Sequence, residues 1–209
     1  TDRAMRHSPD SIRFINARVY RSADDVRPAR SLMTRKGVIH WIGDDAGITA
    51  WVIGPGLGTG HAESATLRAV LATDLPVIVD ADALTTLSRH PHLVRSRAAP
   101  TVLTPHAGEF ERLAGHPPGD DRVGAARALA DDLGATVLLK GNVTVIADPG
   151  GPVYLNPAGA AWAATAGSGD VLSGIIGALL SAGLPPAEAA AAAAFVHARA
   201  AEVAAHDPG

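Results

Sequence analysis

The fold of this 209-residue chain is indicated best by the stretch Pro76-Val77-Ile78-Val79-Asp80-Ala81-Asp82. Its apolar run is rich in β-branched residues and lacks polar alternation, which predicts a short strand buried on both faces. A helical stretch at about 82–89 follows directly. The segment therefore has the strand-then-helix order of a parallel α/β unit.

The same order recurs on both sides of this segment. Further strands are predicted in the apolar runs 50–53, 100–103 and 135–139, and further helices at about 61–73, 107–114 and 120–133. A hairpin over 143–155 turns at Asp148-Pro149-Gly150-Gly151, and helices at about 169–183 and 186–205 complete the pattern. The prediction is an α/β fold with a doubly wound, mostly parallel sheet flanked by helices.

Composition and charge exclude several classes of protein. The formal net charge of −3 leaves no broad cationic field for nucleic acid or an anionic membrane. No apolar stretch reaches the roughly 18 to 20 residues of a membrane-spanning helix, and residues 1–6 do not begin a secretory signal. The absence of cysteine excludes disulfides, thiolate metal sites and cysteine nucleophiles, and it weakly favours a cytoplasmic protein.

The first 45 residues differ in charge from the rest of the chain. Residues 1–45 hold nine Arg or Lys and six Asp, a net charge of +3, whereas residues 46–209 carry −6. Only the short apolar pieces 12–20 and 38–42 occur before the junction, without a sustained period. We therefore expect an atypical basic, poorly patterned arm over 1–45 and a folded domain over 46–209.

Ligands bind at the carboxyl ends of the strands in such a sheet. The glycine-rich loop 54–60 follows the first predicted strand, and it is either a tight turn or a loop that faces a ligand. It matches neither the dinucleotide fingerprint nor a P-loop. Asp80 and Asp82 follow the next strand. They either help to hold Mg²⁺ through water or orient a hydroxyl group, or Asp82 caps the helix that starts there.

Two further strand ends carry polar residues. His106 follows the strand at 100–103, and Glu109 lies in the first turn of the next helix, so both should face the same crevice. A functional role is favoured for His106. Lys140 ends the strand at 135–139 and is the only lysine after position 36, which suggests a phosphate or base clamp over 140–144.

The stretch Gly167-Ser168-Gly169-Asp170 opens the helix at 169–183. Small residues at a helix start expose N–H groups and the positive end of the helix dipole, which suits a phosphate or a developing oxyanion. Asp170 would accept a proton from a substrate hydroxyl. The alternative, that Asp170 only stabilises the helix start, does not explain the three small residues before it.

These motifs occur together and in order in a known family. They are Val52 to Gly58, Val79 to Asp82, Leu103 to Phe110, Leu139 to Thr144 and Gly167 to Gly174. Over about 48–209 the chain closely resembles the ADP/ATP-dependent NAD(P)H-hydrate dehydratase, the carbohydrate-kinase-like domain of the ribokinase superfamily, in its actinobacterial form.

The resemblance implies an activity and a role for each motif. The family restores NADHX and NADPHX, in their S-epimers, to NADH and NADPH. ADP or ATP with Mg²⁺ phosphorylates the hydrate hydroxyl, and phosphate then leaves. Asp170 is implied as the base, with no protein metal ligand assigned. The remaining implied site residues are Gly167, Ser168 and Gly169 in an anion hole, Gly56, Gly58, His106 and Asp170 on the hydrate, and Lys140, Gly141, Asn142, Val143, Thr144 and Gly169 on the nucleotide.

The resemblance also implies features that we do not recognise in the sequence. The family's usual N-terminal strands and small-residue helix are not evident in 1–45, its last helix is not evident before residue 209, and no epimerase domain is recognised. The expected partners are the hydrate, ADP or ATP, an NAD(P)HX epimerase in the same pathway, and further copies of the chain. Two alternatives stay open, a ribokinase-type small-molecule kinase and a truncated, non-catalytic nucleotide-binding homologue.

Overall fold

The computed structural model describes residues 5–8, 11–19, 29–35, 38–43, 49–157 and 167–206. Its central feature is a six-stranded sheet in the order β10-β9-β8-β7-β6-β5. The strands are β5 (Trp51–Ile53), β6 (Val77–Val79), β7 (Thr101–Leu103), β8 (Thr136–Leu139), β9 (Thr144–Ala147) and β10 (Val153–Asn156). Strands β5 to β8 are parallel, and β9 and β10 continue the sheet as an antiparallel hairpin. The predicted mostly parallel α/β sheet is confirmed.

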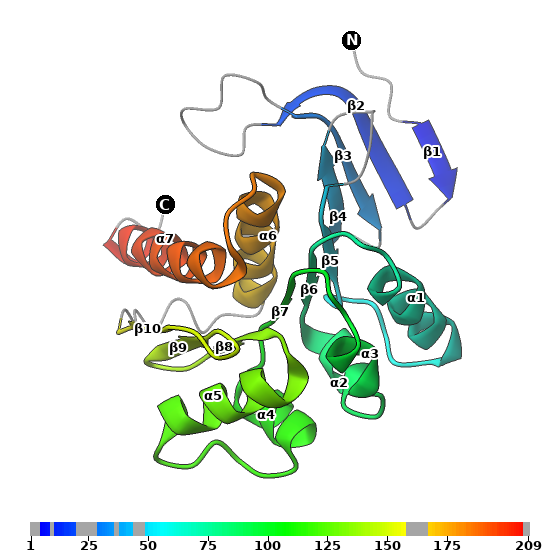
Figure 1. Ribbon diagram of the computed structural model, residues 1–209. Helices are drawn as coiled ribbons and strands as arrows, with labels where there is room; N and C mark the ends of the chain where they lie inside the picture. Colours follow the sequence, from blue (N-terminus) through cyan, green and yellow to red (C-terminus); the bar gives the residue numbers. More distant parts are fainter. Residues whose placement is uncertain are drawn as a thin grey trace.

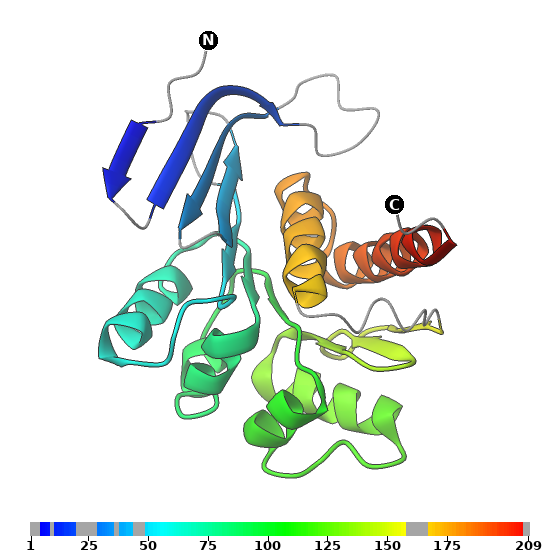
Figure 2. The ribbon, with the colours of Figure 1, turned by 180° about the vertical axis from the view of Figure 1, so that it is seen from behind.

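Helices cover both faces of this sheet (Figures 1 and 2). One face packs against α1 (His61–Leu71), α2 (Ala81–Leu87), α3 (His92–Arg95), α4 (Ala107–Ala114) and α5 (Arg122–Leu133). The other face packs against α6 (Ser168–Ser181) and α7 (Pro186–His206). Successive side chains of a strand point to opposite faces, so Val77 and Val79 enter the first core and Ile78 enters the second. This explains why the strands read as uninterrupted apolar runs.

The helix ends agree with the predicted ones to within two residues. Helices α4 and α5 end at Gly115 and Gly134, which have φ of +81° and +63° and adopt the left-handed conformation that closes a helix. Helix α5 begins at Asp121, whose side chain accepts the N–H of Gly124. Among the described residues no helix is long and apolar enough to cross a membrane.

The segment before residue 45 contains strands, although its sequence shows only short apolar pieces. The strands β1 (Met5–Ser8), β2 (Ser11–Val19), β3 (Ala29–Arg35) and β4 (Val38–Gly43) form an antiparallel sheet in that order. The pairing of β2 with β3 shifts register between Ile15 and Val19, and that of β3 with β4 between Met33 and Thr34. Such irregularities interrupt the two-residue period from which a strand is predicted.

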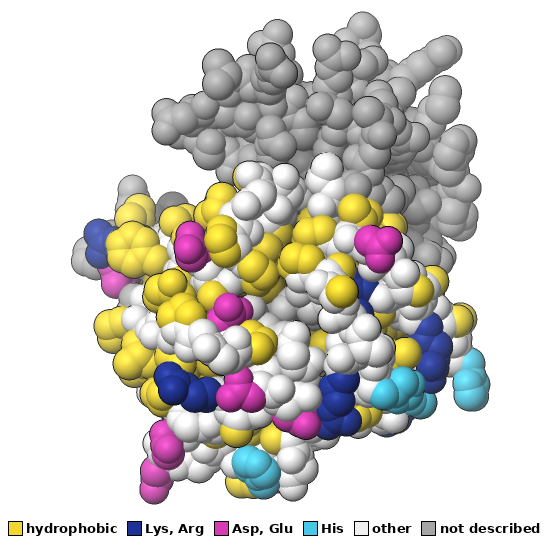
Figure 3. All heavy atoms as spheres, viewed as in Figure 1, with side chains coloured by type: hydrophobic (Ala, Val, Ile, Leu, Met, Phe, Trp, Pro, Cys, Tyr) yellow, Lys and Arg dark blue, Asp and Glu magenta, His cyan; other side chains and the backbone are white. Residues whose placement is uncertain are grey.

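The described surface seen in Figure 3 carries acidic and basic side chains side by side. Hydrophobic side chains gather over α7, where Phe195, Val196 and Val203 are exposed. Within the described part of this face no extended patch has a single sign of charge.

Candidate functional site

Asp80 lies at the centre of the carboxyl edge of the sheet. It follows β6 directly, and only 1% of its surface is exposed. One carboxylate oxygen accepts the N–H of Ala81 and an N–H of the Lys140 ammonium, each at 2.9 Å, and the other accepts the Ser173 hydroxyl at 2.7 Å. Both oxygens of this buried side chain are therefore supplied with hydrogen-bond donors, as burial of a polar group requires.

The backbone around Asp80 is held in an uncommon conformation. Asp80 is the N-cap residue of α2, and Ala81, the first helical residue, has a φ of +47°. Gly54 has a φ of +132°, and a Cβ on it would lie 1.7 Å from the Asp80 carbonyl oxygen. Only glycine at position 54 allows this approach. The strain at Ala81 is of the kind that collects at functional sites.

The helix-capping role that the sequence offers to Asp82 belongs to Asp80 in the structure. Asp80, and not Asp82, caps α2. Asp82 accepts the N–H of Gly58 at 2.8 Å and so ties the glycine-rich loop to the start of α2. Gly56 and Gly58 have φ of +61° and +87°, a conformation that favours glycine. The loop therefore needs glycine for its shape, and it also lies at the edge of the site.

Lys140 connects Asp80 to a second buried carboxylate. Its ammonium nitrogen lies 3.7 Å from a Glu109 oxygen, and Glu109 is 6% exposed. The backbone of Lys140 is also fixed, because its N–H donates to Pro105 and its carbonyl accepts from Arg122. The cation therefore lies in a defined place among the strand ends, as predicted.

His106 is brought to the same edge but also has a structural task. Its Nδ1 accepts the N–H groups of Gly108 and Glu109, at 3.0 and 3.3 Å, while Glu109 accepts the His106 N–H at 2.8 Å. This reciprocal arrangement is a capping box at the start of α4. The ring is 55% exposed, and its Nε2 lies 3.5 Å from Glu109. One ring nitrogen is thus used for capping, and the other faces the cluster.

The start of α6 completes the site. Gly167 has a φ of +87° and serves as N-cap, followed by Ser168, Gly169 and Asp170 in the first turn. A Cβ on Gly169 would lie 3.6 Å from the Lys140 ammonium and 3.9 Å from an Asp80 oxygen. The helix start therefore lies directly beside the buried ion pair.

Asp170 is exposed at this helix start, and its acidity reflects its neighbours. Partial burial raises the pKa of the Asp170 carboxyl, the nearby Asp80 carboxylate raises it further, and Lys140 opposes both. A raised pKa favours proton transfer because it makes the carboxylate a stronger base. Of the remaining predicted residues, Gly141, Asn142 and Val143 are exposed at the turn between β8 and β9, and Thr144 begins β9.

Ser173 is the residue of this cluster that the sequence analysis did not single out. It is fully buried and lies three positions after Asp170, almost one helical turn away. The available signal was a lone hydroxyl in the otherwise apolar stretch from Val171 to Ile176. A polar residue on a buried helix face needs a partner, and that partner is Asp80.

Comparisons with known proteins give this site a family. A family model described as NAD(P)H-hydrate dehydratase matches residues 22–209. The bifunctional NAD(P)H-hydrate repair enzyme Nnr of Mycobacterium leprae is 75% identical over 162 residues, which are 78% of this chain and 34% of the relative. The ADP-dependent (S)-NAD(P)H-hydrate dehydratase of Neisseria meningitidis is 48% identical, over 75% of this chain and 55% of the relative.

The chain belongs to the NAD(P)H-hydrate dehydratase family. Solved structures agree: the ADP/ATP-dependent NAD(P)H-hydrate dehydratase of Bacillus subtilis, co-crystallised with ATP/Mg²⁺, superimposes with a TM-score of 0.68 at 35% identity. That match covers 78% of this chain and 58% of the solved one. The chain spans about a third of the mycobacterial relative and about half of the neisserial one.

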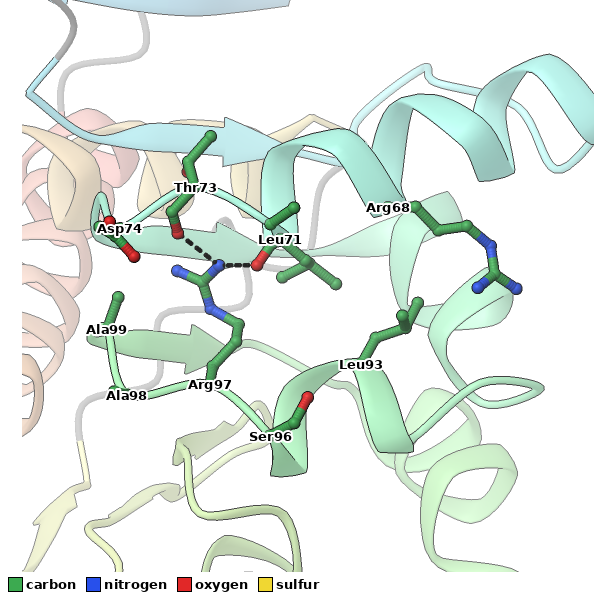
Figure 4. Close-up of a pocket in the computed structure, with 10 residues that line it drawn as sticks. Arg68, Leu71, Thr73, Asp74, Leu93, Ser96, Arg97, Ala98 and Ala99 are labelled. Atoms are coloured by element: carbon green, nitrogen blue, oxygen red, sulfur yellow. Dashed lines mark hydrogen bonds between the residues drawn. The ribbon is translucent and has the colours of Figure 1, made fainter.

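One pocket of this family member lies away from the cluster. It measures about 400 Å³ and is found at the amino ends of β6 and β7 (Figure 4). None of the predicted site residues lines it. Arg97 in its wall donates to the carbonyl oxygens of Leu71, Thr73 and Leu75 and to the Thr101 hydroxyl. The guanidinium therefore ties chain segments together, and we assign this pocket no part in the chemistry of the family.

Proposed function

We propose that this chain is a hydro-lyase that dehydrates the S-epimer of NADHX or NADPHX in a reaction that consumes ADP or ATP. The proposal is supported by the names of the relatives and by one observation above all. Asp170 lies at a glycine-rich helix start, within the electrostatic reach of both Asp80 and Lys140. A base, N–H donors and a cation thus meet at the carboxyl edge of the sheet, where ligands bind in this class of fold.

The proposed reaction begins as a phosphoryl transfer. The Asp170 carboxylate accepts the proton of the hydrate hydroxyl while that oxygen attacks the terminal phosphoryl group of the nucleotide, and the shortened nucleotide leaves. The N–H groups of Gly167, Ser168 and Gly169 would stabilise the charge on the transferring group. Phosphate then leaves with the C–O bonding electrons, a proton is lost from the neighbouring ring carbon, and the ring double bond is restored.

The other predicted residues receive binding roles in this proposal. Gly56 or Gly58 and His106 would contact the hydrate. Lys140, Gly141, Asn142, Val143, Thr144 and Gly169 would contact the nucleotide. Among the described residues there is no group of three or more His, Cys, Asp or Glu that could hold a metal ion. In this proposal Mg²⁺ arrives on the nucleotide phosphates with its own water ligands and offsets their charge, and we assign it no protein ligand.

Several wider expectations belong to the same proposal. They are a catalytic unit over 46–209, assembly with further copies of the chain, cooperation with an NAD(P)HX epimerase and a cytoplasmic location. Each follows from the resemblance or the composition.

The test is recovery of the near-ultraviolet absorbance of reduced nicotinamide when the purified chain meets NADHX, Mg²⁺ and either ADP or ATP. Recovery that requires nucleotide is the expected result. A stable phosphorylated hydrate would instead indicate a small-molecule kinase. No turnover by a folded protein that saturating ADP still stabilises would favour the non-catalytic nucleotide-binding homologue, because a bound ligand at about 100 times its Kd adds roughly 2.7 kcal/mol. No turnover and no stabilisation would favour a scaffold that binds no nucleotide.

The raised pKa of Asp170 also predicts a pH dependence. The base acts only when deprotonated, so kcat/KM should fall as the pH drops through the pKa of Asp170. Because that pKa lies above the ordinary value of 3.8, the acid limb should begin at a higher pH than for an unperturbed aspartate. A rate that stays constant down to the ordinary carboxyl range would argue against Asp170 as the base.

A further inference from the structure

Asp80 is the point at which three parts of the site are joined. Its backbone ends β6 and starts α2, one carboxylate oxygen binds Lys140 after β8, and the other binds Ser173 on α6. These elements are far apart in sequence, since Asp80 and Ser173 are separated by 93 positions. No other described carboxylate contacts both the sheet edge and α6 through hydrogen bonds that the structure shows.

Lys140 needs such a partner to stay in one place. A lysine side chain has several rotatable bonds, and holding it in a single conformation costs conformational entropy. Its nitrogen lies 2.9 Å from Asp80 and 3.7 Å from Glu109, and the side chain is 24% exposed. Asp80 is therefore the partner that fixes the cation beside Gly169.

The start of α6 depends on the second oxygen of Asp80. Gly167, the N-cap residue, has no side chain with which to cap the helix. The fully buried Ser173 hydroxyl donates to Asp80 at 2.7 Å, almost one turn after Asp170. This bond sets the position of α6 along the sheet edge, and with it the position of the Gly167–Gly169 N–H groups and of Asp170.

We propose that Asp80 is the positioning residue of this site: its buried carboxylate holds the Lys140 ammonium and, through Ser173, the first turns of α6 in their working arrangement. The catalytic roles of Lys140 and Asp170 rest on the proposed function, whereas the bonds from Asp80 to Lys140 and Ser173 are a property of the folded chain. Asp80 does not reach solvent, so it acts through Lys140, Ser173 and Asp170 and not by contact with a substrate.

The linkage also has an electrostatic effect that can be measured. The charged groups that act on Asp170 from the elements around it are Asp80, at the end of β6, and Lys140, at the end of β8. Glu109 of α4 contacts the same ammonium. Replacing Asp80 by Asn removes a negative charge and releases Lys140 from its ion pair. Both changes favour ionised Asp170, so its pKa should fall.

The experiment compares Asp80→Asn and Ser173→Ala with two matched controls. Asn keeps the ability to cap α2, so the first variant chiefly removes charge, whereas the second removes the link to α6 alone. Asp132→Asn removes the acid of an exposed ion pair with Arg95, and Ser181→Ala removes a hydroxyl from the far end of α6. The controls should retain wild-type kcat and pH profiles.

We expect the two links to give different signatures. Asp80→Asn should lower kcat about 100-fold, the effect of misplacing reacting groups by about 1 Å, and should move the acid limb of the pH profile to lower pH. Ser173→Ala should lower kcat about 10-fold, in keeping with the loss of one hydrogen bond to a charged group, and leave the acid limb in place. In both variants the KM for nucleotide should change less than kcat.

A measurement without substrate separates this inference from the proposed function. The pKa of the Asp170 carboxyl is followed by carbon NMR in the free wild-type and Asp80→Asn proteins. A fall in the variant supports the linkage even if the wild type shows no dehydratase activity, which would sink only the proposed function. An unchanged pKa, or active wild type with Asp80→Asn and Ser173→Ala both within about twofold of its kcat, would overturn the inference. If Asp80→Asn fails to fold, the kcat of Ser173→Ala against Ser181→Ala decides.

Discussion

The two ends of the central sheet each hold a charged side chain, a buried one at the carboxyl ends and a partly buried one at the amino ends, and they use it differently. At the carboxyl ends Asp80 binds a lysine, a serine and a backbone N–H, and it acts on the titratable Asp170. At the amino ends Arg97 binds three backbone carbonyl oxygens and a threonine hydroxyl. Figure 4 shows its bonds to Leu71 and Thr73. Both charges are satisfied, but Asp80 binds another charged side chain, Lys140, whereas the hydrogen-bond partners of Arg97 are carbonyl oxygens and a hydroxyl.

The difference shows that burial of a charge is not by itself a sign of function. Arg97 holds together the end of α1, the segment before β6 and the start of β7, which is a structural task. Burial lowers the pKa of Arg97 and the nearby Asp74 opposes this, yet arginine stays charged throughout the physiological range. Perturbed groups indicate a functional site when their neighbours can also exchange protons or ligands. Substitutions at four positions test this contrast between the two ends.

Gly54→Ala should have the largest effect, because the added methyl group collides with the backbone of Asp80. The added Cβ would meet the Asp80 carbonyl oxygen at 1.7 Å, which the fold cannot absorb without moving β6 or α2. We expect a loss of about 4 kcal/mol or more in the free energy of unfolding, measured by urea denaturation. Gly150→Ala is the control, since Gly150 also has a positive φ but nothing lies within 4 Å of its Cβ position. It should cost only about 1 to 2 kcal/mol, and equal losses in the two variants would disprove the clash.

Asp170→Asn should lower turnover by about 10² to 10⁴, the usual contribution of a positioned general base. The fold should be retained, and Tm should stay the same or rise slightly, because the substitution removes the repulsion between Asp170 and Asp80. The measurements are nicotinamide recovery and thermal melting. Glu188→Gln, which changes an acid in the first turn of α7, is the matched control. Wild-type turnover in Asp170→Asn would remove Asp170 from the mechanism.

Arg97→Met should reverse this pattern by reducing stability and sparing the chemistry. The carbonyl oxygens of Leu71, Thr73 and Leu75 lose a charged donor, for which we expect a cost of about 2 to 4 kcal/mol. Arg95→Met provides the comparison, because Arg95 forms an exposed ion pair with Asp132 and should cost about 1 kcal/mol or less. The decisive outcome is kcat under conditions where the variant is folded: a loss comparable to that of Asp170→Asn would contradict the contrast.

His106 allows the smallest and sharpest test, because it combines both kinds of task at the carboxyl end. His106→Ala removes the cap of α4 and should cost about 1 kcal/mol, whereas His106→Asn should keep most of the capping energy. If the ring also contacts the hydrate, both variants should raise the KM for NADHX while only the alanine variant melts earlier. A wild-type KM in His106→Asn would show that His106 caps α4 and does not contact the hydrate.

Much of the carboxyl-end site could be predicted from the sequence, because Asp80, His106 and Lys140 each follow a predicted strand. In a parallel sheet such positions meet at one edge whatever lies between them, so these three residues could be brought together without coordinates. The start of α6 had a different signal, the small residues that open a helix. The capping of α2 by Asp80 instead of Asp82 could not be predicted, because it depends on the residue at which α2 begins. Boundaries of that kind vary by one or two residues and are not encoded in an apolar pattern.

Other parts of the molecule had weaker signals for physical reasons. Arg97 binds carbonyl oxygens 22 to 26 positions earlier in the chain, and backbone acceptors leave no trace in a sequence. Strands β2 and β3 carry register shifts that break their periodicity. Ser173 left a signal, a hydroxyl among apolar residues, but its meaning appears only when the partner Asp80 is known.

The left-handed backbone of Ala81 has a consequence for how this protein tolerates mutation. A non-glycine residue at a φ of +47° is uncommon, and β-branched side chains are the least compatible with it. In a saturation library, position 81 should accept Gly, Asn and Asp and reject Val, Ile and Thr, although alanine itself is small. The amino acids that selection for activity permits at position 81 would then report the φ angle of this residue and not the space around its side chain.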